Sequence, residues 1–533
     1  MKKFIKKYWL LILAVVIGFT LRFYKVGDLP SILNRDEAAL AYNAYLLAET
    51  GRDEWGRAWP LTLESFGDYK LPGYTWALVP WFKVFGLSDT IVRMPSVLAG
   101  CLLIVVFYLW LKTLGVKEKF SLLGAWLIAL LPVSIFYSRM AYEANIGLTL
   151  MVIDLWLITL LSKKWSSKAF IPLIASLLLG VFTYNTPWIL LPFFIVYVLL
   201  IFSKKDRKKS ILLSGVIAGI FLLGAKLLLP LASQKSGITI FSDETTWDSW
   251  IKYRENLNPK WLWLLGSQYV YWVGLMWTKF WQSFTPSFLV TSGGNHSWHR
   301  LPTWGHLNFL IYGMGWLGLA ITLKELWSVG IKKLLSLKNL GKETRINLAT
   351  LFLFFTSLAP SVITIDAPHA TRSLLFFIFW VYWAVKGLSW LYESKFWPTK
   401  NMFWMIICLV IWVESLWHAQ QLYVAYPKTQ GMFEPGYDGM ITYLEDNYPR
   451  APIAIVDPSG YKYILTAWYL RIPPDQYFGT NVRQLPDKIG FRYGEQVTHY
   501  HFIADPNDRS EEEKILLQWI SKTEQWRIWG ISL

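Results

Sequence analysis

The chain has 533 residues, of which 54% are hydrophobic and only 17% are charged, and its mean hydropathy is +0.33. This composition is too apolar for an ordinary soluble enzyme, and it predicts a protein that crosses a membrane several times. The net charge of +16 does not indicate a nucleic-acid partner, because the Lys and Arg residues cluster in short loops between apolar runs, as cytoplasmic anchors do.

Eleven apolar runs approach the length needed to cross about 30 Å of hydrocarbon as helices. They lie at 8–24, 94–111, 120–138, 145–161, 169–183, 188–202, 210–230, 305–323, 346–364, 373–391 and 402–418. The first run follows a basic start, as in a signal peptide, but no small-x-small cleavage site precedes Arg22, so we expect a retained span. The runs predict an all-α polytopic membrane protein with about eleven transmembrane helices.

A further apolar stretch, 72–86, is short, contains Pro80 and carries Lys83, so its pattern alone does not show whether it crosses the membrane. If it does not cross, every strongly basic loop falls on one side, as expected for the cytoplasmic side. We therefore predict that 72–86 is a juxtamembrane or re-entrant helix. The predicted extracytoplasmic segments are then 25–93, 139–144, 184–187, 231–304, 365–372 and everything after about 419.

The apolar runs stop at residue 418, which predicts a transmembrane domain over 1–418 and a second domain over 419–533. In the second domain, PIAIVD (452–457) and THYHFIAD (498–505) are typical of strands. EEEKILLQWISKTEQW (511–526) is typical of a helix. We expect a small extracytoplasmic α/β domain, whose role the sequence does not indicate.

The triplet Arg-Asp-Glu occurs twice near the first predicted span. In the first copy, Asp36 and Glu37 follow Asn34 and open the apolar, helix-prone run AALAYNAYLLAET. Acids at a helix N-terminus cap free amides and complement the helix dipole, so spacing alone favours a structural role for this pair. In the second copy, Asp53 and Glu54 lie in the polar stretch GRDEWGR, where we expect a solvated loop.

Polar residues also mark the other predicted outer segments. In DYKLP, Lys70 stands directly before 72–86, where a lysine can simply snorkel to the interface. Arg139, Glu143 and Asn145 occupy a very tight turn between two spans, and polar residues near the bilayer edge usually pair with each other or bind a ligand.

Two further outer loops are rich in histidine and arginine. They contain His296, His299, Arg300 and His306 in the first loop, and His369 and Arg372 in the second. A metal site at the three histidines of the first loop is one interpretation, but no Cys or paired carboxylate accompanies them. Cationic residues around an anionic lipid headgroup fit the composition better, and a requirement for a divalent metal is left open.

Together these loops present an acidic pair and the cations Lys70, Arg139, Arg300 and Arg372 on one predicted face. A carboxylate base beside a phosphate-binding cationic cluster suits transfer of a group from a lipid phosphate donor. The main alternative is a transporter or flippase, which should carry ionisable residues near the membrane midplane and repeated halves. Asp154 and Lys226 are the obvious intramembrane charges, and no repeat is visible.

The sequence resembles the membrane glycosyltransferases with the GT-C fold, in particular the protein mannosyltransferase and aminoarabinose transferase relatives of glycosyltransferase family 39. The resemblance rests on LRFYKVGDLPSILNRDEAALAYNAYLL (21–47), GRDEWGRAWPLTLESFGDYKLPGY (51–74) and GLSDTIVRMPSVLAG (86–100), and more weakly on YSRMAYEANIGL, GGNHSWHRLPTWGHL and APHATRSL. It implies an integral membrane enzyme that takes a sugar from a polyprenyl-phosphate carrier on the extracytoplasmic side and inverts the anomeric centre. The acceptor could be a protein, a lipid or a glycan.

The resemblance also implies roles for individual residues. Asp36 matches the general base, with Glu37 beside it, and Lys70 matches a residue that contacts the lipid phosphate. Arg139 matches the arginine after the third span, and Arg372, with Arg300, would add phosphate ligands by analogy. The predicted substrate-binding residues are Asp68, Tyr69, Glu143, Asn145, Tyr184, His296, His299 and His369.

The chain departs from the family pattern at two places. Leu71 precedes Pro72 where many relatives have two prolines, and the YNTPW loop (184–188) lacks an expected arginine. Hydrogen bonds from Tyr184 and Asn185 could compensate for the second difference.

Overall fold

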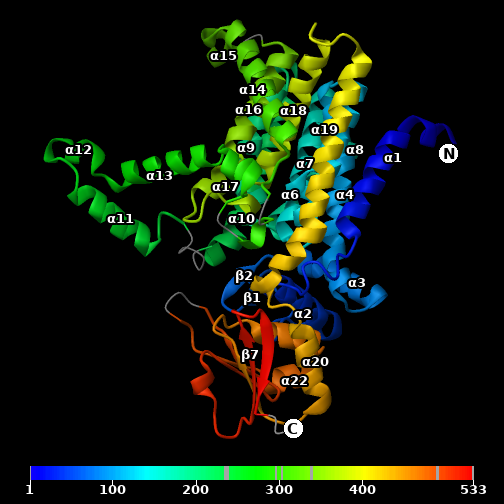
Figure 1. The fold of residues 1–533 in the computed structure, drawn as a ribbon. Helices are drawn as coiled ribbons and strands as arrows, with labels where there is room; N and C mark the ends of the chain where they lie inside the picture. The colour runs from blue at the N-terminus through cyan, green and yellow to red at the C-terminus, as the bar shows by residue number, and fades with distance from the viewer. Residues whose placement is uncertain are drawn as a thin grey trace. The chain divides into compact units, whose positions relative to one another are not determined.

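The computed structural model describes residues 2–232, 239–294, 297–301, 304–336, 340–487 and 491–530. Contacts divide the chain into two compact units (Figure 1). The first, here called the helical unit, comprises 1–22, 97–138 and 143–422. The second, here called the sheet unit, comprises 23–96, 139–142 and 423–533.

The helical unit is built from long apolar helices, and every predicted run overlaps a helix. These are α1 (Lys2–Phe23), α4 (Asp89–Leu114), α5 (Glu118–Ala129), α6 (Pro132–Ser138), α7 (Glu143–Lys163), α8 (Ser167–Thr183), α9 (Asn185–Ile201), α10 (Arg207–Ala232), α14 (Phe309–Val329), α16 (Lys342–Thr356), α17 (Ala359–Val362), α18 (Leu374–Glu393) and α19 (Lys400–Gln420). Among the described residues, seven helices are long and apolar enough to span a membrane, or eight if the bent pair α5 and α6 is one span. The predicted polytopic helical membrane protein is confirmed, while the number of spans stays a prediction.

The bend between α5 and α6 follows from Pro132, and a buried arginine compensates for it. The two helices meet at 52°, because proline lacks the N–H that would continue the helical hydrogen bonds. Arg22 of α1 is fully buried and donates to carbonyl oxygens at the bend. Its guanidinium contacts Ala129 O at 2.9 Å, Ile128 O at 3.2 Å and Ser134 Oγ at 2.8 Å. This contact fixes the end of α1 to the bend.

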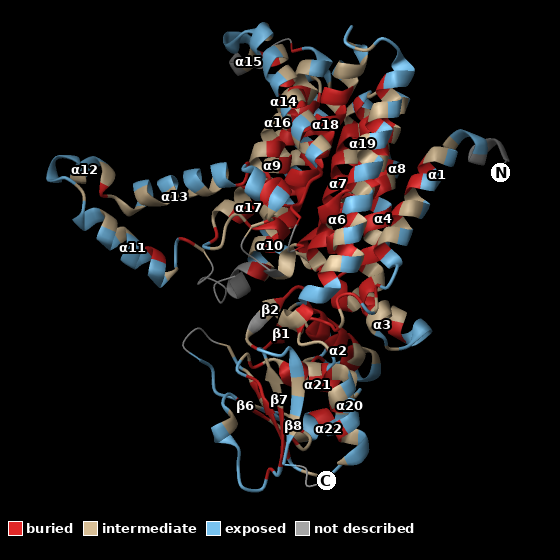
Figure 2. Ribbon diagram, in the orientation of Figure 1, coloured by how far each residue is buried: buried red, intermediate tan, exposed pale blue. Residues whose placement is uncertain are grey.

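The core of the helical unit lies along α18, most of whose residues are buried (Figure 2). A different segment, comprising α11 (Glu244–Glu255), α12 (Leu262–Leu265) and α13 (Gln268–Gln282), is largely exposed in the same view. Two further short helices of this unit are α15 (Ile331–Ser336) and the π-helical turn Ser287–Thr291, whose central residues are buried.

The sheet unit joins the segment after α1 to the carboxy-terminal part of the chain. Its first part contains α2 (Arg35–Thr50), the hairpin β1 (Leu63–Ser65) and β2 (Asp68–Lys70), and α3 (Gly73–Phe85). Its second part contains α20 (Tyr437–Asn447), β3 (Ile453–Val456), α21 (Lys462–Tyr469), α22 (Pro474–Thr480), β4 (Val482–Arg483), β5 (Gly494–Val497), β6 (Tyr500–Ile503), β7 (Ile515–Ile520) and β8 (Gln525–Trp529). The stretch 72–86 is therefore helical as predicted, and its place relative to a membrane stays a prediction.

The carboxy-terminal strands form a six-stranded mixed sheet in the order β4-β5-β6-β3-β7-β8. The central strand β3 is parallel to both neighbours, β6 and β7, and the outer pairs are antiparallel. The strands predicted at 452–457 and 498–505 are confirmed as β3 and β6.

The helix predicted over 511–526 is wrong, because this segment forms the hairpin of β7 and β8. Its apolar part, Ile515 to Ile520, is too short for periodicity to separate a buried strand from a helix. Pairing with β3, in which Ile453 lies opposite Ile515, decides the conformation.

The prediction that Asp53 and Glu54 form a solvated loop is also wrong, since both residues are buried. Asp53 forms an ion pair with Arg57 at 2.8 Å. Glu54 accepts hydrogen bonds from Asn43 Nδ2 at 2.9 Å, Ser65 Oγ at 2.6 Å and Tyr463 Oη at 3.2 Å, and it pairs with Arg483. Two of these partners lie more than 400 positions further along the chain, so only the folded carboxy-terminal part covers the carboxylate.

The same part of the chain holds α2 and the start of α4. Tyr42 Oη of α2 donates to Ile472 O at 2.9 Å, and Tyr469 Oη accepts from Leu33 N at 2.8 Å. Asp89 accepts from Trp468 Nε1 at 2.9 Å. Residues 423–533 therefore pack as one unit with 23–96, a grouping that the sequence did not indicate.

Replacing Arg483 should destabilise the sheet unit. Arg483→Met leaves the buried Glu54 carboxylate without its cation, and breaking a buried pair costs about 3–5 kcal/mol. We expect a lower apparent Tm of the full-length protein in detergent and faster limited proteolysis within 423–533. The matched control is Arg527→Met, because Arg527 is exposed on the same sheet. Equal stability of the two variants would contradict the role given to Arg483.

Candidate functional site

The predicted acidic pair lies at the N-terminus of α2, where Asn34 caps the helix. Asn34 Oδ1 accepts from the backbone N–H of Asp36 at 2.9 Å and of Glu37 at 3.0 Å. Glu37 Oε2 accepts in return from Asn34 N at 3.1 Å, which completes a capping box. The capping role that spacing favours is confirmed for Glu37. Because successive helical residues point about 100° apart, the two acids face different surroundings.

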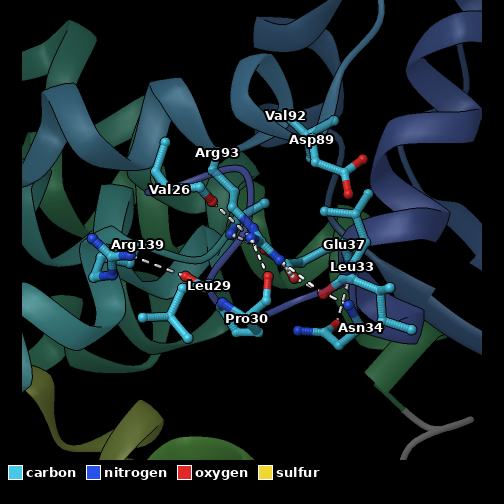
Figure 3. Close-up of polar contacts among 12 residues, drawn as sticks. Val26, Leu29, Pro30, Leu33, Asn34, Glu37, Asp89, Val92, Arg93 and Arg139 are labelled. Atoms are coloured by element: carbon cyan, nitrogen blue, oxygen red, sulfur yellow. Dashed lines mark hydrogen bonds and ion pairs between the residues drawn. The ribbon is translucent and has the colours of Figure 1, made fainter. Parts of the chain in front are cut away.

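Glu37 is fully buried and bound on both oxygens (Figure 3). Its Oε1 lies 2.9 Å from Arg93 Nε, and its Oε2 lies 3.1 Å from Arg93 Nη2. Ala141 N also donates to Oε1 at 2.7 Å. A carboxylate held in this way cannot accept a proton from a substrate without losing these contacts. They give Glu37 a positioning role, and its predicted catalytic role stays a prediction.

Arg93, in the first turns of α4, organises the loop that precedes α2. Its remaining N–H groups donate to Val26 O at 2.7 Å, Pro30 O at 3.0 Å and Ile32 O at 3.0 Å (Figure 3). Sequence analysis did not single out this residue. The available signal was an arginine at the very start of an apolar run, a position where a charge usually has a partner.

Arg139 is also engaged by backbone, although it was predicted to bind phosphate. Its Nη1 donates to Tyr24 O at 2.7 Å, and its Nη2 donates to Lys25 O and Leu29 O, each at 3.1 Å. Burial lowers the pKa of Arg139 to about 10, which leaves the guanidinium charged at neutral pH. With these contacts the guanidinium ties down residues 24–29, and its predicted role at a phosphate stays a prediction.

Asp36 differs from Glu37 in being accessible, and it lies beside the predicted lysine. The Asp36 Oδ1 atom lies 2.9 Å from Lys70 Nζ, with the Asp36 side chain 39% exposed and that of Lys70 6% exposed. The lysine comes from β2, and its ammonium lies 4.5 Å from the centre of the Phe66 ring. The pair thus combines a possible proton acceptor with a cation.

The other predicted residues of the hairpin are placed by its pairing. In the register of the hairpin, Lys70 lies opposite Leu63, Tyr69 opposite Glu64 and Asp68 opposite Ser65. Tyr69 and Lys70 therefore point to opposite faces of the hairpin. Only the backbone of Asp68 is described, so its predicted contact with substrate stays a prediction.

A second group of predicted residues lies together in the helical unit. Arg372 donates to Thr364 Oγ1 at 2.9 Å and pairs with Asp366, and His369 Nε2 lies 3.7 Å from Asp366 Oδ2. The His299 and His369 rings are 4.8 Å apart between centroids. The structure therefore brings together two histidines and one arginine from loops about seventy residues apart in the sequence.

The remaining predicted residues of the helical unit serve local contacts. Arg300 Nη1 donates to Ser292 O at 2.9 Å, and His306 Nε2 lies 2.9 Å from Gly293 O. Asn145 Nδ2 donates to Ser138 Oγ at 3.4 Å. Glu143 begins α7, and Tyr184 lies between α8 and α9.

The part of the chain that the structure describes contains no candidate group of ligands for a metal site. Among those residues, no three His, Cys, Asp or Glu side chains are arranged to hold a metal ion. His296, the first histidine of the proposed set, lies outside the described residues.

The two acids should respond differently to removal. Glu37→Ala leaves the Arg93 guanidinium buried without its anion, which costs about 3–5 kcal/mol. Asp36→Ala removes a carboxylate that is 39% exposed, so it should lower stability less than Glu37→Ala, although its partner Lys70 is buried. Thermal unfolding of both full-length variants in detergent measures the difference, and a Glu37→Ala protein as stable as Asp36→Ala would contradict the positioning role.

Comparison with known proteins gives matches in structure only. No protein-family model matches the sequence, and no curated protein matches it. The fold is similar to that of the Archaeoglobus fulgidus oligosaccharyltransferase in a crystal structure with a tethered acceptor peptide, with 14% identity over 95% of this chain and a TM-score of 0.55. A structure of the same organism's AglB, in complex with an inhibitory peptide and a dolichol-phosphate, gives 15% identity over 94% of this chain and a TM-score of 0.55.

The chain spans 65% of the length of both archaeal structures. ArnT from Cupriavidus metallidurans bound to undecaprenyl phosphate also matches, with 13% identity over 87% of this chain and 85% of that chain and a TM-score of 0.49. At these identities the likeness concerns the fold alone. The helices, the sheet and the two archaeal matches show that the chain has the same fold as the archaeal oligosaccharyltransferase, which confirms the predicted GT-C fold.

Proposed function

We propose that the protein is an inverting glycosyltransferase that moves a sugar from a polyprenyl-phosphate carrier to an acceptor hydroxyl on the extracytoplasmic face of the membrane. The observation that carries this proposal is the contact between the accessible Asp36 carboxylate and the Lys70 ammonium at 2.9 Å. A base and a cation within one hydrogen bond suit a reaction in which a hydroxyl loses a proton while a phosphate departs.

The reaction is a single displacement at the anomeric carbon. Asp36 accepts the proton of the acceptor hydroxyl as its oxygen forms the new bond to the sugar. The bond between the anomeric carbon and the phosphate oxygen breaks on the opposite face, and the electron pair leaves with the polyprenyl phosphate. Lys70 stabilises the charge that grows on this phosphate. Arg372, in the helical unit, stays a predicted further phosphate ligand.

The neighbouring residues support this division of roles. Glu37 and Arg93 neutralise each other inside the sheet unit, so neither adds a competing charge to the pair of Asp36 and Lys70. The fold supports the same proposal, because the AglB structure that it resembles was determined with a dolichol-phosphate. Neither observation identifies the sugar or the acceptor.

The direct test is to incubate the purified protein with a panel of polyprenyl-phosphate sugars and to detect free polyprenyl phosphate. A transferase releases the carrier from at least one member of the panel when a suitable acceptor is present. A flippase would move the intact lipid across a vesicle membrane and release no carrier. Transbilayer movement without release from any donor would overturn the proposal.

Asp36→Asn should remove most of the transfer activity while the protein still binds the donor. The substitution keeps the size of the side chain but removes the proton acceptor, and positioned base catalysis is worth about 10² to 10⁴ in rate. The measurement is the rate of carrier release, together with the Kd for the lipid-linked sugar. Asp28→Asn is the matched control, because Asp28 is an exposed aspartate of the same unit. Near-normal turnover of Asp36→Asn would exclude it as the base.

Lys70→Gln should weaken binding of the polyprenyl phosphate itself. A hydrogen bond to a charged group is worth about 1.5–3 kcal/mol, so we expect roughly a tenfold to hundredfold rise in the Kd for the free carrier. Lys83→Gln serves as the control, since Lys83 is an exposed lysine of α3. Unchanged affinity of Lys70→Gln for the carrier would show that the lysine serves Asp36 alone.

A further inference from the structure

A groove of about 770 Å³ lies in the helical unit between α1, α4 and α7. Its walls are apolar along most of their length, with Leu11 and Val15 from α1, Val105 and Leu109 from α4, and Leu160 from α7. None of these residues belongs to the proposed glycosyltransferase site.

Two contacts hold the carboxy-terminal end of α1 against its neighbours. Arg22 holds the end of α1 at the bend between α5 and α6. One turn earlier, Gly18 lies so close to α4 that an added Cβ would be 2.5 Å from Ile104 Cδ1. Towards its N-terminus α1 diverges from its neighbours, as Figure 1 shows, and the groove opens there.

Positive charge is concentrated at one end of the groove. Lys112 and Lys163 line it from the last turns of α4 and α7, near Tyr8 of α1. Glu118 pairs with Lys112 at 2.7 Å, and Lys7 acts electrostatically on the same carboxylate. With Lys163 also lining the groove, the lysines at this end outnumber the one carboxylate that pairs with Lys112, so the net charge there is positive.

We propose that this groove binds an anionic glycerophospholipid, with an acyl chain against the apolar walls and the phosphate beside Lys112 and Lys163. Basic pockets between transmembrane helices are suited to anionic headgroups. From Tyr8 to Val16 the groove follows α1 for about 12 Å, at 1.5 Å per residue. This length is close to one leaflet of the hydrocarbon core, about 15 Å. It matches an acyl chain better than a polyprenyl chain that must extend further.

The groove is far from the arginine and histidine cluster of the same unit. Arg372 lies just before the first residue of α18, and Glu393 ends this helix. Glu393 forms an ion pair with Lys117. Lys117 comes shortly after the last turn of α4, where Lys112 lines the groove. A helix of this length covers about 30 Å, so the two features lie at opposite ends of the helical unit. With the predicted topology, the phospholipid belongs to the cytoplasmic leaflet.

The test measures lipid binding to the full-length protein. Native mass spectrometry of the delipidated protein, titrated with phosphatidylglycerol or phosphatidylcholine, should show one site that prefers phosphatidylglycerol. The double variant Lys112→Gln/Lys163→Gln should weaken this binding on the order of thirtyfold, since each lysine near an anionic surface contributes about 1 kcal/mol. The matched control, Lys164→Gln/Lys168→Gln, removes the same charge from exposed positions that do not line the groove.

A second variant tests the apolar part of the groove. Ile12→Trp adds a bulky ring at a partly exposed lining position, and it should reduce phosphatidylglycerol binding while both lysines remain. Equal binding by the lysine variant and its control, or equal affinity for both phospholipids, would overturn the proposal. Displacement of phosphatidylglycerol by an equimolar amount of polyprenyl phosphate would also overturn it, because the groove would then be a carrier site.

Discussion

The buried ion pair of Glu37 and Arg93 is the interaction on which the candidate site depends. All five N–H groups of Arg93 are used, by the two carboxylate oxygens and by the carbonyls of Val26, Pro30 and Ile32. Removing two charges from water is costly, and only complete pairing offsets that cost. The segment before α2 can therefore adopt few other conformations. The position of Asp36, one residue before Glu37, follows from this constraint.

Two adjacent acids lie in different environments because successive side chains of a helix point about 100° apart. Glu37 points into the sheet unit and closes the capping box, whereas Asp36 remains partly exposed beside Lys70. The two acids therefore serve different purposes. Glu37 fixes the start of α2, and Asp36 is left accessible with a cation next to it. An Arg-Asp-Glu triplet at a helix N-terminus can in this way hold its own accessible carboxylate in place.

The carboxy-terminal part of the chain supports the candidate site through contacts with α2 and its flanking segments. Tyr469 binds Leu33 N and Asp89, and Arg483 neutralises Glu54 beneath α2. These contacts give the last hundred residues a structural task in the sheet unit. The second Arg-Asp-Glu triplet is therefore as structural as Glu37, although it lies in a polar stretch of sequence.

The sequence by itself determined the features that depend on neighbouring residues. The apolar runs predicted the helices because length and hydropathy are local properties, and Asn34 predicted the start of α2 because capping involves the next three residues. The importance of Asp36 and Lys70 came from family resemblance, and the structure adds their contact. Only the tertiary structure decided the environments of Glu37, Glu54 and Arg139. Whether a charge is buried and which groups neutralise it depend on residues that lie tens to hundreds of positions away in the chain, and folding alone brings those residues together.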